Sequence, residues 1–130
     1  MKLTRIVARP LLASIFVSAG VNHLQNPGHA AGLVEPLTSQ LPDTVPPQLA
    51  DPEKLVLANA VVQVGAGSAL ALGIKPKWAA LALVGSLVPT TLAGHRFWEI
   101  EDPQMKAMQR IQFLKNTALI GGLLSVVGQD

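Results

Sequence analysis

The order of apolar and polar residues predicts four helices long enough to cross a lipid bilayer. The clearest stretch runs from Leu55 to Ile74, contains no charged residue and lies between Lys54 and Lys75. A membrane-spanning helix needs about 20 mostly apolar residues, which this stretch supplies. A second apolar stretch, Trp78 to Gly94, follows after a short Lys-Pro-Lys turn. We expect the four helices at about 6–24, 55–74, 78–94 and 105–127.

The first predicted helix has two interpretations. Basic residues precede an apolar run from Pro10 to Leu24, as in a secretory signal, and Gly28-His29-Ala30 offers a small-x-small cleavage site. The downstream chain is equally apolar, so a retained helix is the simpler interpretation.

The last predicted helix has a defined start. Asp102 is suited to cap it and Pro103 to occupy its first turn. Its membrane part runs from Phe113 to Gly128, and Lys115 near that start can extend toward the headgroups.

An extramembrane loop, 25–54, separates the first two spans. It is rich in proline, and we expect one short helical turn near 31–40. The apolar residues around that turn are expected to lie flat on the membrane interface: Leu33, Val34, Leu37 and Leu41.

The distribution of charge predicts an orientation. Four spans put both termini on the same side. The positively charged N-terminal segment and the Lys75–Lys77 turn favour the cytoplasm for that side, whereas the 25–54 loop carries mostly acidic residues. The third connection opposes this orientation with Arg96, Lys106 and Arg110, although it also holds three acidic residues that can pair with them.

Composition supports a membrane protein formed by a single domain, 1–130. The chain is 49% hydrophobic and 14% charged, with a mean hydropathy of +0.39, whereas soluble domains carry about 25% charged residues. The net charge of +2 and the absence of a Lys/Arg run argue against nucleic acid as a partner. The lack of cysteine excludes disulfides and thiol chemistry carried by this chain.

Polar residues recur at helical spacing within the spans, which predicts one polar stripe per helix. Helices in lipid associate through close packing and interhelical hydrogen bonds, so these stripes are expected to face the bundle interior. They act either as structural glue, which we favour, or as the wall of a polar cavity. The predicted interior residues are Ser14, Ser18, Asn22, Asn59, Gln63, Thr90 and Asn116.

Four residues near span ends are candidates for a binding site: Arg9, His95, Trp98 and Lys115. The two cations suit an anionic headgroup or an acidic partner, Trp98 suits stacking on a ring, and His95 suits donation to a carbonyl oxygen. The alternative is anchoring at the headgroups. We predict no metal site, because His23 and His95 are far apart in sequence and lack a suitably spaced carboxylate.

Three segments resemble the DoxX family of membrane proteins. Arg9 to Leu24 is similar to the family's first helix, Gly94-His95-Arg96-Phe97-Trp98 to its His-x-Phe-Trp element, and Gln112 to Leu124 to its Phe-Leu-Lys-Asn fourth helix. Two positions depart from the family pattern. His23 stands where Lys is more usual, and Gln63 stands where Glu is common, which removes an obvious proton-handling group.

The resemblance implies a four-helix, multi-pass protein of the cytoplasmic membrane. Relatives are linked to membrane-bound redox, some as subunits of thiosulfate:quinone oxidoreduction. We therefore expect an accessory or scaffold subunit, without catalytic activity of its own, for a membrane or peripheral redox or stress-response partner. The alternatives are a quinone-reactive oxidoreductase subunit, with quinone as cofactor, or a small-molecule carrier. The sequence leaves self-association open.

Overall fold

The computed structural model describes residues 2–129, and over that range it is helical, without a strand. This confirms the predicted all-α class. The helices are α1 (Lys2–Gln25), α2 (Pro27–Thr38), α3 (Pro47–Ala50), α4 (Pro52–Leu72), α5 (Pro76–Gly94), a 3₁₀ turn η1 (Phe97–Glu99) and α6 (Pro103–Val127).

Proline and aspartate fix where these helices begin. Every helix from α2 to α6 starts at a proline, whose missing N–H costs nothing in the first turn. Asp51 accepts hydrogen bonds from the backbone N–H of Glu53 at 3.0 Å and of Lys54 at 3.3 Å. Asp102 accepts from the N–H of Gln104 at 3.4 Å, so the predicted start of the fourth long helix is confirmed.

The segment between the first two long helices is more ordered than a loop with a single turn. α2 spans 12 residues from Pro27 and contains Pro36, and the short α3 follows after residues 39–46. The backbone N–H of Asn26 still bonds to the carbonyl of Asn22 at 2.9 Å, so α2 follows α1 almost without a break.

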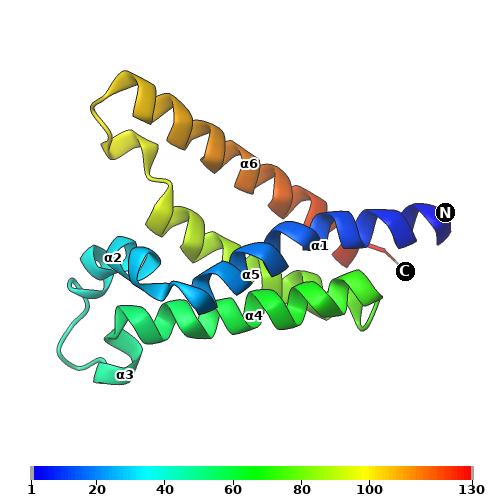
Figure 1. The fold of residues 1–130 in the computed structure, drawn as a ribbon, viewed down its shortest axis with the longest axis horizontal. Helices are drawn as coiled ribbons and strands as arrows, with labels where there is room; N and C mark the ends of the chain where they lie inside the picture. Colours follow the sequence, from blue (N-terminus) through cyan, green and yellow to red (C-terminus); the bar gives the residue numbers. More distant parts are fainter. Residues whose placement is uncertain (1, 130) are drawn as a thin grey trace.

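Contacts join the long helices into a ring that is open on one side, and Figure 1 shows these helices from the side. α1 packs along α4, α4 against α5, and α5 against α6, whereas α1 and α6 barely touch. α2 folds back over the end where α4 begins, and it contacts α4, α5 and α1. Leu70, Leu83 and Leu123 are the largest fully buried side chains of the core.

Two glycines allow α1 and α4 to approach closely. A Cβ at Gly20 would lie 2.7 Å from Val64 Cγ2 and 2.9 Å from the carbonyl oxygen of Ala60. A Cβ at Gly67 would lie 2.9 Å from Val17 Cγ2. Small residues at such crossings are typical of helix pairs in membranes.

The face of α1 fixed by this crossing differs from the predicted one. Its buried residues are Ala13, Phe16 and Gly20. Ser14, Ser18 and Asn22 lie on exposed faces instead, so their assignment to the bundle interior is wrong. The three polar residues do have helical spacing, but the face of α1 that packs on α4 is the one with small residues. Ser14 Oγ donates instead to the carbonyl of Leu11 in its own helix, at 2.7 Å.

Three helical segments are long and apolar enough to cross a membrane: Lys2–Gln25, Pro52–Leu72 and Pro76–Glu99. The last includes α5 and η1. Many large apolar side chains of these segments are exposed, among them Leu11, Leu72 and Trp78. An apolar outer surface of this kind suits contact with lipid. α6 has the necessary length, but its first half carries Lys106, Arg110 and Lys115.

Candidate functional site

A cavity of about 600 Å³ lies inside the ring of helices. It is lined mainly by apolar side chains from α1, α2, α4, α5 and α6. Because both α1 and α6 contribute to its wall and hardly touch each other, the cavity lies beside the open side of the ring. Its volume falls within the range of small-molecule sites.

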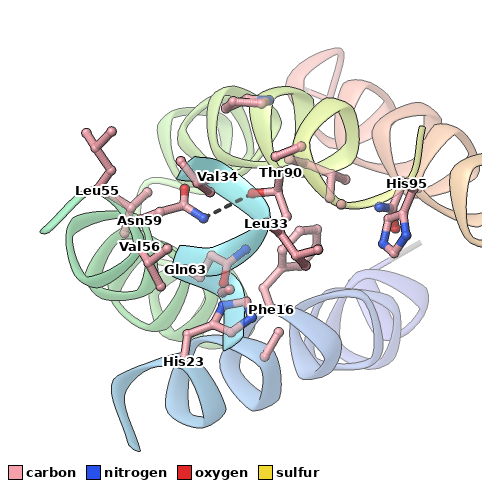
Figure 2. Close-up of a pocket in the computed structure, with 18 of the residues that line it drawn as sticks. Phe16, His23, Leu33, Val34, Leu55, Val56, Asn59, Gln63, Thr90 and His95 are labelled. Atoms are coloured by element: carbon pink, nitrogen blue, oxygen red, sulfur yellow. Dashed lines mark hydrogen bonds between the residues drawn. The ribbon is translucent and has the colours of Figure 1, made fainter. Parts of the chain in front are cut away.

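α2 covers one end of this cavity. Leu33, Val34 and Leu37 line it, and Figure 2 shows the helix lying across the space between the longer helices. Val34 and Leu37 are half-buried there, whereas Leu33 lines the cavity and is also 42% exposed, so the expected position of these residues at the membrane interface stays a prediction. Leu41 does not line the cavity and is 41% exposed.

Two amide side chains near the cavity join neighbouring helices. Asn59 Nδ2 of α4 donates to Thr90 Oγ1 of α5 at 3.1 Å, as Figure 2 shows, and Thr90 Oγ1 donates to the carbonyl of Ser86. Asn116 Nδ2 of α6 donates to Thr91 Oγ1 of α5 at 3.0 Å. These contacts agree with the predicted role of polar residues as glue between helices.

Gln63 is the exception. It lines the cavity and is 3% exposed, but its Oε1 has no hydrogen-bond partner among residues 2–129. An unpaired buried carbonyl costs about 1–3 kcal/mol. The carbonyl and NH₂ ends of an amide are related by rotation about its terminal torsion, so Gln63 can present an acceptor or a donor to an occupant of the cavity.

Two further polar residues line the cavity near α6. His95 Nδ1 lies 2.6 Å from Gln109 Oε1. If Gln109 Oε1 accepts this hydrogen bond, the His95 imidazole donates it through Nδ1. In the neutral imidazole, Nε2 then carries no proton and can accept a hydrogen bond. Lys115 Nζ donates to Gln112 Oε1 at 2.6 Å. In Figure 2, His95 lies on the opposite side of the view from Leu55 and Asn59.

The structure separates the four candidate site residues. His95 and Lys115 line the same cavity. Trp98 does not; its ring packs edge-on against Phe97 and Phe113, with centroids 5.3 Å and 5.8 Å apart, and fixes η1 on α6. Arg9 lies near the end of α6, where its Nη2 donates to Gln129 Oε1 at 3.3 Å.

The sequence interpretation missed two parts of the wall. His23 lines the cavity from α1, although it was not among the four candidate binding residues. The α2 contribution was also missed, because nothing in the local pattern shows that this segment folds back. The described residues contain no group of three or more His, Asp or Glu side chains able to hold a metal ion.

Removing the buried hydrogen bond between α5 and α6 is expected to loosen α6. Thr91→Val deletes the acceptor for Asn116 and should cost about 1 kcal/mol, the size typical of such bonds between membrane helices. Thermal unfolding in detergent measures the change. Thr117→Val is the control, because Thr117 Oγ1 is exposed and donates only to Phe113 in its own helix. Equal stability of the two variants would contradict the prediction.

The fold and cavity define a class of helical membrane protein with a ligand-sized interior. Residues 4–96 match the family model for DoxX, which is more than half of the chain, and the protein belongs to the DoxX family. The match begins within α1, covers α2 to α5 and ends before η1, so Phe97, Trp98 and the resemblance seen in 112–124 lie beyond it. No curated protein and no solved structure matches the chain.

Proposed function

We propose that this DoxX protein is a four-helix, multi-pass protein of the cytoplasmic membrane that serves as an accessory subunit and holds a small amphipathic ligand. The observation that carries the proposal is the cavity under α2 with the unpaired amide of Gln63 in its wall. The redox or stress-response partner is the part of the proposal that rests on family resemblance alone.

α6 is the fourth span in this proposal. The buried residues Asn116, Leu123 and Val126 pack it into the bundle, while its basic residues precede or begin the apolar part. Arg9 and Gln129 join the start of α1 to the end of α6, which supports termini on the same side. We assign that side to the cytoplasm because Lys75 and Lys77 lie at the same end of the molecule and the 25–54 segment carries mostly acidic residues. Arg96, Lys106 and Arg110 belong to the other end, so the Lys/Arg count alone does not decide the orientation.

The cavity wall indicates what kind of ligand it holds. Ile15, Leu55, Val62 and Leu119 form apolar surface, which suits a hydrocarbon or ring. Gln63 and His95 each place one polar side chain in the wall, and either side chain can form a hydrogen bond with a hydroxyl or carbonyl of that ligand. The open side of the ring between α1 and α6 suits entry from the bilayer.

Filling the cavity tests this proposal. Ala93 lines it, so Ala93→Phe is expected to displace the ligand, whereas Ala118→Phe on the exposed face of α6 is not. Protein purified in mild detergent is extracted, and its small molecules are quantified by mass spectrometry. We expect a compound bound to the wild type and Ala118→Phe and at least tenfold less in Ala93→Phe. Equal recovery from both variants would contradict ligand binding in this cavity.

A quinone-reactive subunit is the second candidate function. The apolar wall and the Gln63 and His95 side chains suit a quinone ring with its oxygens. Quinone in the extract of the wild type, absent from Ala93→Phe, favours this candidate. A soluble redox enzyme that co-purifies, and is lost on mutating Arg96, Glu99 or Arg110, favours a scaffold instead. If the protein is a carrier, substrate flux is expected in vesicles that contain this chain alone.

The proposed topology has a direct test, because the chain contains no cysteine. A single cysteine at Asp43 is expected to react with a membrane-impermeant maleimide in intact cells. A single cysteine at Lys75 is expected to react only after the membrane is permeabilised. The reverse pattern would invert the orientation, and labelling of both in intact cells would contradict four spans.

A further inference from the structure

A second cavity, of about 350 Å³, lies at the end of the molecule opposite α2. Three basic residues from three parts of the chain line it: Arg9 of α1, Lys75 of the α4–α5 turn and Lys77 of the first turn of α5. Its other described lining residues are Pro76, Trp78, Val126 and Gln129, so none is acidic. Three like charges that share a cavity without an acidic side chain among the described lining residues favour an anion.

The arrangement of Arg9 leaves part of its guanidinium unused. Nη2 donates to Gln129 Oε1 at 3.3 Å, which fixes the side chain against the end of α6. Nε is buried and has no partner among residues 2–129. A buried, charged donor without an acceptor is costly, and an oxygen from a bound anion would satisfy it.

The turn beside Arg9 is held in one conformation. Gly73 ends α4 in the left-handed region with φ 73°, and Ile74 N donates to the carbonyl of Ala69 at 2.8 Å. Lys75 also has a positive φ, 42°, which is unusual for a residue with a side chain. A Cβ at Gly73 would lie 3.4 Å from Arg9 Nη1, so this turn packs directly against the guanidinium.

The start of α5 adds to the positive potential. No side chain caps this helix of 19 residues, and Pro76, Lys77 and Trp78 of its first turn line the cavity. The unpaired N–H groups of a first turn carry partial positive charge and bind phosphate oxygens. The first turn of α5 and the three basic side chains therefore line the same cavity.

We propose that this basic pocket binds the phosphate of an anionic phospholipid in the leaflet that faces the N-terminus. The surface around the pocket favours a lipid over free phosphate, because Leu72, Ile74 and Trp78 are 75%, 56% and 71% exposed beside it. Acyl chains can cover these side chains while the headgroup contacts the cations, and tryptophan is typical of this depth in the membrane.

Tryptophan fluorescence gives a local reading of this binding. The chain has two tryptophans, so Trp98→Phe leaves Trp78 at the pocket as the sole reporter. The Trp98→Phe protein is placed in phosphatidylcholine nanodiscs with increasing phosphatidylglycerol. We expect a saturable change in emission, half-complete at a phosphatidylglycerol fraction that rises about fivefold with Lys77→Gln and further with Arg9→Gln.

Two comparisons decide the outcome. Lys54→Gln with Lys106→Gln removes two exposed charges outside both cavities and should leave the midpoint unchanged. Lys77→Gln is the variant least expected to misfold, because the Lys77 side chain is exposed. An equal shift in this control pair would mean that total charge matters and the pocket does not. Saturation by millimolar inorganic phosphate, with no response to phosphatidylglycerol, would overturn the lipid assignment.

Discussion

Replacing Gly20 with leucine is expected to prevent the close packing of α1 on α4. Even a Cβ at this position would meet Val64 at 2.7 Å and the backbone carbonyl of Ala60 at 2.9 Å. The Ala60 carbonyl belongs to the regular backbone of α4 and cannot rotate to relieve the clash. Overpacking by a few carbon atoms typically costs about 1–3 kcal/mol, so alanine should lose roughly that much and leucine more.

Size-exclusion chromatography and thermal unfolding in detergent measure this effect. Gly65→Leu is a matched control, because it lies on α4 with nothing within 4 Å of an added Cβ. We expect Gly65→Leu to give folded protein in normal yield and Gly20→Leu to give little or none. Similar yields and midpoints for the two variants would show that the helices separate without cost, contrary to the observed packing.

Replacing Gln63 with leucine is expected to change stability and ligand binding in opposite directions. Leucine removes a buried carbonyl that has no partner among the described residues, so ligand-free protein should become more stable by about 1 kcal/mol. The same change removes the most buried polar side chain that lines the large cavity. Recovery of the bound compound should therefore fall about tenfold, the equivalent of one well-formed hydrogen bond.

The comparison for this prediction is Gln25→Leu at the exposed end of α1. It makes the same chemical change away from both cavities and should alter neither property. Lower stability of Gln63→Leu, with ligand recovery unchanged, would mean that Gln63 has an internal structural role. That result would remove the main support for a ligand in the cavity.

Local signals in the sequence were sufficient for the helical class and for most helix limits. Uncharged runs bounded by lysine mark α4 and α5, and the aspartate-proline pair at 102–103 marks the start of α6. Asn59, Gln63, Thr90 and Asn116, which helical spacing placed on the predicted polar stripes, all line the large cavity.

Properties that depend on contacts between distant segments were not predictable in this way. On α1 both the polar stripe and the small-residue face have helical spacing, and the steric fit of Gly20 to α4 decides between them. The binding candidates show the same limit. His95 and Lys115 share one cavity, whereas Arg9 lines the other. All three residues lie near span ends, but the sequence does not show which span ends meet at the same end of the bundle.

Because α1 and α6 are in incomplete contact, the affinity for a ligand of the large cavity should be expressed relative to its concentration in the bilayer. A compound that reaches the interior sideways first dissolves in the bilayer, so its occupancy follows its mole fraction among the lipids. Two compounds that fit equally well would then be ranked by their partition coefficients. Titrations in detergent micelles would dilute both and understate the difference that the cell experiences.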